Sequence, residues 1–187
     1  MILALVTGVA ASALASNSSP FHWGQGDRPR AWFTIVDHTP EPWPVQAATN
    51  EWDFAGRVDV IYRFGGCGGL GHCVPVRTSL SGDFDGVGCN LLRGVFYRQF
   101  NGNHIIPSSA RIRVNGRCEN SQFTRQNRRG IVCHEEGHAM RLIHADTSFL
   151  GQTCMAGANA QQWLNRAATP RHHDFVMVDD VIYDHNH

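Results

Sequence analysis

The segment His134-Glu135-Glu136-Gly137-His138-Ala139-Met140-Arg141-Leu142-Ile143-His144 is the most informative part of this chain. Two histidines four residues apart, His134 and His138, project from the same face of a helix, because four residues advance about 400° around its axis. At this spacing two imidazoles can bind one zinc ion. Glu135 follows the first histidine, so its carboxylate can reach the open side of such a metal and act on a bound water. The segment therefore predicts a zinc-binding helix.

The third ligand has to come from outside the helix. A catalytic zinc ion needs three protein ligands and one open position, and this chain has no glutamate after Glu136 to serve as a distant ligand. His144 follows His138 by six residues, which on a continuous helix would turn its side chain about 120° away from the ligand face. A break in the helix near Arg141 would let His144 complete a three-histidine site. Asp146 is the alternative ligand, although a carboxylate in a surface turn is its ordinary interpretation.

The same residues carry a resemblance to a known family. With the segment 153–157 (Thr-Cys-Met-Ala-Gly) that follows, they resemble the metzincin zinc peptidases, whose third histidine is followed by a Met-turn. Within this family, the chain resembles matrixin-like members of the bacterial secreted type. The resemblance implies three zinc ligands, one general base and one apolar residue beneath the metal, namely His134, His138 and His144, Glu135, and Met155.

Two positions depart from the family pattern. Arg141 stands where the family has glycine, at a turn whose left-handed backbone costs a residue with a side chain roughly 1 kcal/mol. Gly157 stands where several related enzymes have a tyrosine that steadies the oxyanion. Apart from these two positions, the resemblance implies a zinc endopeptidase in which Glu135 transfers a proton from water to the leaving amine. The alternatives are a non-catalytic extracellular domain stabilised by zinc, and a zinc hydrolase that acts on a non-peptide substrate.

Composition favours one secreted catalytic domain. The first fifteen residues are apolar and small and end in Ala13-Leu14-Ala15, which resembles a signal peptide and its cleavage site, so residues 16–187 would form a single domain. Six cysteines form an even set that suits disulfides in an oxidising compartment, with fifteen connectivities open. The formal net charge is zero, with 16 basic and 16 acidic residues. We expect protein or peptide substrates, no nucleic acid or membrane partner, and a monomer.

Sequence patterns place the elements around the zinc helix. Apolar and β-branched runs predict strands at residues 31–37, 57–64, 93–100 and 110–115. Three- and four-residue spacing predicts helices at 45–54 and 121–143, a short turn at 161–166 and a last helix from His172. The resemblance implies an α+β, metzincin-like catalytic domain. Its expected parts are a twisted, mostly parallel β-sheet with an antiparallel edge strand, a backing helix, the active-site helix, the Met-turn and a C-terminal helix.

The segment 65–90 is rich in glycine and cysteine and lacks periodicity, so we expect a long loop held by disulfides. Within it, Asp83-Phe84-Asp85-Gly86 shares carboxylates and a glycine with calcium loops. It lacks the third acidic position and the closing glutamate. An ordinary turn is the default interpretation, and Ca²⁺ binding is the lesser alternative to the single Zn²⁺ expected in the chain.

The strand before the zinc helix is a candidate substrate-binding element. In metzincin-like enzymes this strand is the sheet edge that holds substrate by backbone pairing, a form of β-augmentation. The resemblance assigns that role to the segment from Ser109 to Asn115, with Ser109, Ala110, Arg111, Ile112 and Arg113 as its substrate-binding residues. The other interpretation is a plain edge strand whose arginines deter aggregation.

Overall fold

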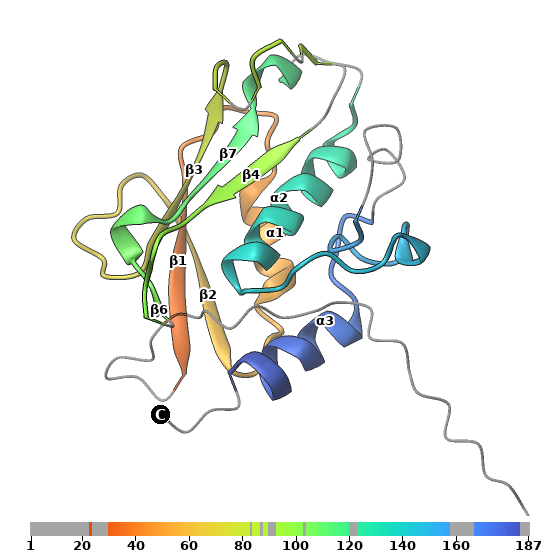
Figure 1. The fold of residues 1–187 in the computed structure, drawn as a ribbon. Helices are drawn as coiled ribbons and strands as arrows, with labels where there is room; N and C mark the ends of the chain where they lie inside the picture. The colour runs from red at the N-terminus through yellow and green to blue at the C-terminus, as the bar shows by residue number, and fades with distance from the viewer. Residues whose placement is uncertain are drawn as a thin grey trace, which may run out of the picture.

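A computed structural model describes residues 23, 30–82, 84–86, 88–89, 93–102, 104–119, 123–157 and 167–183. The fold is mixed α/β, with a central, mostly parallel sheet and few helices (Figure 1). The predicted signal peptide and the predicted helical turn at 161–166 lie outside the described residues. In the part that is described, no helix is long and apolar enough to cross a membrane.

The central sheet has five strands in the order β2-β1-β3-β7-β4. β2, β1, β3 and β7 run parallel, and β4 pairs antiparallel with β7 at the edge, as the predicted topology requires. The strand bounds are β1 Ala31–Asp37, β2 Val58–Phe64, β3 Cys73–Ser79, β4 Gly94–Tyr97 and β7 Arg111–Asn115. A separate two-stranded sheet pairs β5 Phe100–Asn101 with β6 His104–Ile105.

Two helices lie side by side on one face of the sheet. They are α1 Val45–Trp52 and α2 Arg125–Ala139, and α3 His172–Val176 continues into the π-helix Met177–Ile182 (Figure 1). Among the described residues, short 3-10 helices span Pro107–Ser109, Gly116–Cys118 and Thr147–Phe149. Trp52 of α1 is fully buried, and its indole N–H donates to the carbonyl of Cys133 in α2. This contact fixes the position of α2 relative to the helix behind it.

Two sequence predictions about the sheet are wrong. The segment 65–90 is not a continuous loop, because it contains the central strand β3. Pro75 concealed this strand, since proline lacks the N–H that sheet pairing uses. The structure accommodates it because Pro75 lies opposite Val36 of β1, whereas the pairing of β3 with β7 begins only at Val76.

The second correction concerns the edge of the sheet. β7 pairs with β3 on one side and with β4 on the other, so the segment from Ser109 to Asn115 does not form the edge. Ser109 ends a 3-10 helix and Ala110 is buried. The sequence reasoning took the strand that directly precedes the helix in the chain, whereas the earlier strand β4 folds back and covers it. β4 is the edge strand beside α2.

All six cysteines are paired, as predicted. The disulfides are Cys67–Cys73, Cys89–Cys118 and Cys133–Cys154. In the stretch that resembles a calcium loop, Asp83 lies outside the described residues, and the carboxylate of Asp85 accepts a hydrogen bond from the backbone N–H of Gly82. The described residues of that stretch form a turn, which is its default interpretation.

Candidate metal centre

The start of α2 is set by a reciprocal cap. The hydroxyl of Thr124 accepts a hydrogen bond from the backbone N–H of Asn127, and the Asn127 side chain accepts one from the backbone N–H of Thr124. This arrangement satisfies two amide groups that a helix start leaves without partners. The predicted helix, 121–143, is too long at both ends, because Thr124 caps its first turn and Ala139 is its last residue.

The end of α2 is a tight turn at Arg141. Its backbone adopts a φ of 79°, in the left-handed region that glycine usually occupies. The N–H of Arg141 donates to the carbonyl of His138, and the N–H of Leu142 donates to the carbonyl of Gly137. These two bonds form a Schellman motif, which closes a helix and redirects the chain. The bend that a third histidine ligand requires is therefore present, with arginine in the place of glycine.

Burial around Arg141 supports this turn. The residue is only 6% exposed, and burial lowers the pKa of its guanidinium to about 10, an effect that the nearby Tyr183 partly opposes. The indole N–H of Trp23 donates to the carbonyl of Ala139, 2.7 Å away, at the last residue of the helix. Trp23 and Tyr183, from opposite ends of the described chain, thus lie close to the end of α2.

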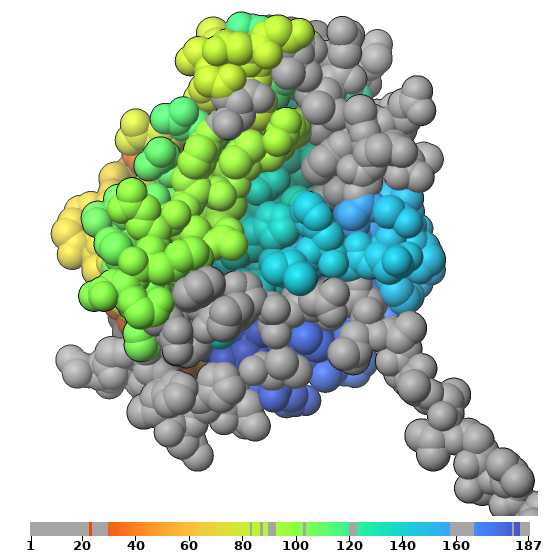
Figure 2. Space-filling view, in the orientation of Figure 1, coloured from red at the N-terminus to blue at the C-terminus, as the bar shows by residue number. Residues whose placement is uncertain are grey.

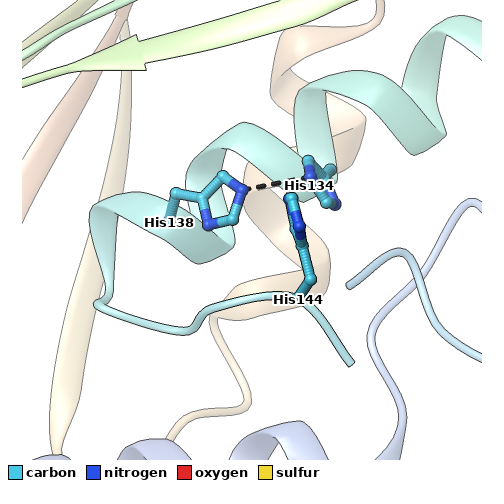
Figure 3. A group of neighbouring side chains, drawn as sticks. All are labelled: His134, His138 and His144. Carbon is cyan, nitrogen blue, oxygen red and sulfur yellow. Dashed lines mark hydrogen bonds between the residues drawn. The ribbon is translucent and has the colours of Figure 1, made fainter. Parts of the chain in front are cut away.

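The three predicted histidines converge after this turn. His134 and His138 project from α2, and His144 reaches the same place from the segment beyond the helix (Figure 3). One ring nitrogen from each lies within 4.8 Å of the others. Among the described residues, this is the group with a geometry able to hold a metal ion. His134 is buried, whereas His144 is exposed, so the cluster opens to solvent on one side.

Hydrogen bonds fix which nitrogens face inward. Nδ1 of His134 lies 2.8 Å from the carbonyl oxygen of Cys154, and Nδ1 of His138 lies 2.7 Å from that of Leu142. A carbonyl only accepts, so each Nδ1 carries the proton, and each neutral ring then presents a lone pair at Nε2. The two Nε2 atoms lie 3.0 Å apart. Two lone pairs facing each other at this distance repel unless a proton or a metal ion lies between them.

This donor set fits zinc. Neutral imidazoles are good zinc ligands, and their second nitrogen is commonly held by a backbone carbonyl, as it is in His134 and His138. Asp146 does not join the cluster. Its carboxylate instead accepts a hydrogen bond from the backbone N–H of Ser148, which lowers its pKa, in an exposed turn. Asp146 is therefore a carboxylate in a surface turn, which is its ordinary interpretation.

Met155 packs directly beneath the helix that carries the histidines. Its side chain is fully buried, and a Cβ placed on Gly137 would overlap its sulfur atom. That Cβ would also lie 3.0 Å from the Trp52 ring. Glycine at position 137, between the two histidines of α2, is therefore required for this close approach.

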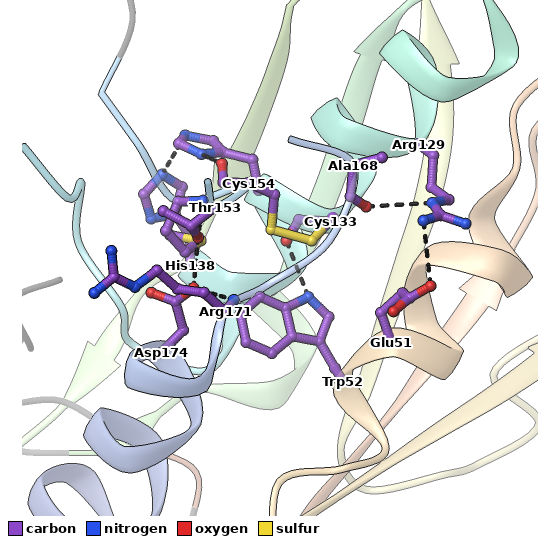
Figure 4. Close-up of a disulfide and its surroundings, with 12 residues drawn as sticks. Glu51, Trp52, Arg129, Cys133, His138, Thr153, Cys154, Ala168, Arg171 and Asp174 are labelled. Atoms are coloured by element: carbon purple, nitrogen blue, oxygen red, sulfur yellow. Dashed lines mark hydrogen bonds and ion pairs between the residues drawn. A yellow bond between two sulfur atoms is a disulfide. The ribbon is translucent and has the colours of Figure 1, made fainter. Parts of the chain in front are cut away.

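The segment that contains Met155 is held in two further ways (Figure 4). Cys154 is joined to Cys133 by a disulfide buried beside His134. Thr153 donates a hydrogen bond from its hydroxyl to the buried carboxylate of Asp174 in α3, and it accepts one from the backbone N–H of Met155. No pattern in the sequence indicated the contact between Asp174 and Thr153.

The two adjacent glutamates face different surroundings. Glu135 lies under the edge strand, since a Cβ on Gly94 would come within 2.6 Å of its Cγ. Glu136 is fully buried on the other side of α2, where its Oε1 accepts a hydrogen bond from the Thr49 hydroxyl at 2.8 Å. Burial raises the pKa of Glu136 well above its ordinary value. Burial thus favours the neutral form of Glu136, and Glu135 is the carboxylate beside β4.

Comparisons with known proteins do not by themselves identify a family for this chain. No family model matches the sequence, and no curated protein matches it. Among solved structures, the chain is similar to archaemetzincin from Archaeoglobus fulgidus in complex with malonate, with 13% sequence identity and a TM-score of 0.42. The match covers 76% of this chain and 97% of that chain. A TM-score of this size does not establish a common fold, and the candidate site therefore stands on its own geometry.

Proposed function

We propose that this protein is a secreted zinc-dependent endopeptidase of the metzincin type. The observation that carries the proposal is the pair of Nε2 atoms of His134 and His138, 3.0 Å apart, with both Nδ1 atoms held by carbonyls and with His144 beside them. The three disulfides fit an oxidising, extracellular location. The signal peptide proposed for residues 1–15 would deliver the chain there.

Each residue of the site has a separate role in the proposed reaction. His134, His138 and His144 would hold the ion, and Met155 would form the apolar floor of the site. A bound zinc ion supplies Lewis acidity, which polarises the scissile carbonyl and lowers the pKa of an attacking water. Glu135 accepts the proton of that water and delivers it to the leaving amine. No separate nucleophilic side chain is needed.

Substrate would lie along β4. In the described sheet β4 pairs with β7 on one side, and its opposite edge faces no further strand. An extended peptide can add to such an edge through backbone hydrogen bonds, which hold it without regard to its side chains. Gly94 at the start of β4 lies against Glu135, so a peptide on this edge passes the general base. The proposal thus moves substrate pairing from β7 to β4.

Metal analysis and two neighbouring glutamine variants test the proposal. The purified protein should contain one zinc ion per chain and hydrolyse casein and members of a peptide library. Glu135→Gln should keep the zinc and lose hydrolysis by about 10²- to 10⁴-fold. Glu136→Gln is the matched control and should keep activity, because glutamine has the shape of the neutral acid that burial favours at this position.

Two outcomes would contradict the proposal. Full hydrolysis by Glu135→Gln would exclude the assigned base. A wild-type protein that binds zinc tightly and cleaves no peptide would favour the zinc-stabilised binding domain. Gly157 gives that alternative some weight, since its Cα lies beside His144 and it carries no side chain for the oxyanion.

A further inference from the structure

A cation, Arg98, directly follows the edge strand β4. Side chains alternate along a strand, so positions 94, 96 and 98 share one face. The Cβ position of Gly94 on that face points at Glu135, and Phe96 is buried in the core. Arg98 follows at the end of the strand, on the same face. In Figure 2 the light-green surface of this region lies directly against that of α2 and the segment after it.

Aromatic rings hold the Arg98 side chain in place. Its guanidinium carbon lies 5.4 Å from the ring centroid of Phe96 and 5.4 Å from that of Phe100. Partial burial lowers the pKa of Arg98, and the carboxylate of Glu135 acts in the opposite direction. Arginine nevertheless keeps its charge in proteins. A fixed cation is thus within electrostatic reach of the proposed general base.

A recess next to Arg98 contains a second arginine. It has a volume of about 360 Å³ and is lined by Tyr97, Arg98, Gln99, Ser108, Ser109 and Arg111. The Arg111 guanidinium lies 4.6 Å from the Tyr97 ring centroid, which fixes its position. None of the residues that line the recess is acidic. Both arginines thus border a space that is otherwise lined by neutral residues.

The recess lies where an extended substrate would pass. Arg98 is four residues beyond Gly94, a distance of about 13 Å along an extended strand. A peptide paired with β4 and cut beside Glu135 would thus reach the recess about three to five residues from the scissile bond. Deterring aggregation at a sheet edge does not explain Arg111, because β7 is an interior strand.

We propose that this recess is a substrate subsite for a carboxylate side chain, so that the protein prefers peptides with Asp or Glu three to five residues from the cut. The proposal rests on the proposed peptidase function and specifies its substrate class. A carboxylate there would receive charge-assisted hydrogen bonds from a bordering guanidinium, Arg98 or Arg111, in the bidentate geometry that such groups favour.

Pairs of otherwise identical peptides test this preference. A neutral fluorogenic peptide is synthesised with Glu or Gln at each position from three to five residues on either side of the cut. Wild type should cleave one Glu peptide about tenfold faster in kcat/KM than its Gln partner, mainly through a lower KM. The ratio should fall as salt increases. A ratio near one at every position would overturn the proposal.

Variants attribute the preference to the recess. Arg98→Gln and Arg111→Gln should bring the Glu to Gln ratio close to one, and because each ratio is taken within one variant, a general loss of activity cancels. Arg77→Gln is the matched control, since Arg77 lies on β3 opposite Arg113 and does not line the recess. It should keep the wild-type ratio. A preference that survives in both recess variants would overturn the assignment.

Binding separates this inference from the peptidase proposal. Fluorescence polarisation with Glu135→Gln measures the affinity of the labelled Glu and Gln peptides without any cleavage. Tighter binding of the Glu peptide, abolished by adding Arg98→Gln, supports the subsite even if wild type proves inactive. Equal binding of the two peptides overturns the subsite, while cleavage of neutral peptides by wild type would leave the peptidase function intact.

Discussion

The carbonyl oxygen of Cys154 lies 2.8 Å from Nδ1 of His134, and the disulfide from Cys154 leads back to Cys133, the residue that precedes His134. The same short segment therefore holds the first histidine twice, through a covalent bond and through a hydrogen bond. A carbonyl at Nδ1 sets the tautomer of the ring, and the disulfide ties the residue that provides this carbonyl to the residue before His134.

Removal of this disulfide should weaken metal binding. The double variant Cys133→Ala/Cys154→Ala should lose about 2 to 4 kcal/mol of unfolding free energy and bind zinc about tenfold more weakly. Urea denaturation measures the first quantity, and competition with a chelator measures the second. Cys67→Ala/Cys73→Ala is the control, because that disulfide closes a loop far from the histidines in the chain. Equal zinc affinities in the two double variants would show that Cys133–Cys154 does not position His134.

Asp174 should act on the metal site through Thr153. Its buried carboxylate accepts hydrogen bonds from the Thr153 hydroxyl and from the backbone N–H of Arg171. Asp174→Ala leaves both donors without this acceptor, which should cost about 2 to 3 kcal/mol and lower zinc affinity about tenfold. Asp180→Ala, on the exposed side of the same helical segment, should change neither quantity. A stability loss with unchanged zinc affinity would confine Asp174 to a role in folding.

A methyl group on Gly137 should disturb the site from below. In Gly137→Ala the new Cβ meets the Met155 sulfur and the Trp52 ring, and overpacking of this kind costs about 1 to 3 kcal/mol. We expect weaker zinc binding as well, since position 137 lies between His134 and His138. Gly71→Ala is the control, because its Cβ would meet no atom within 4 Å. Adding Met155→Ala should recover part of the loss, and strict additivity would contradict this packing account.

The sequence predicted the parts of the site that depend on local spacing. Helical periodicity places His134 and His138 on one face, and counting residues to His144 requires a bend near Arg141. The bend is present, and the three rings meet. Local patterns also predicted β1 with its observed bounds. These features follow from interactions between residues that are close in the chain, whereas the mostly parallel sheet with an antiparallel edge was an implication of the metzincin resemblance.

The features that sequence reasoning missed depend on contacts between distant segments. Pro75 argued against a central strand, and only the stagger between β1 and β7 makes it acceptable there. The order of β7 and β4 is decided by which strand packs over α2, so the edge was assigned to the wrong segment. The pairing of Cys133 with Cys154 and the approach of Arg98 to Glu135 likewise follow from the assembled fold.

Arg141 provides the sharpest test of the turn that delivers His144. Its left-handed backbone costs an arginine or an alanine about 1 kcal/mol more than a glycine, so Arg141→Gly should be about 1 kcal/mol more stable than Arg141→Ala. Comparing these two variants removes the effect of the buried guanidinium, which both of them lack. Chemical denaturation measures the difference, and a more stable alanine variant would contradict the assigned backbone conformation.

Arg141→Pro then asks whether the turn is needed for the metal. Proline fixes φ near −65° and removes the N–H that bonds to the carbonyl of His138, so the Schellman motif cannot form. If His144 reaches the cluster through this turn, zinc affinity should fall by more than the 10- to 100-fold typical when a supporting residue is lost. Adding His144→Ala to Arg141→Pro should then cause little further loss. A large additional loss would mean that His144 binds zinc without the turn, because a ligand already displaced has no affinity left to remove.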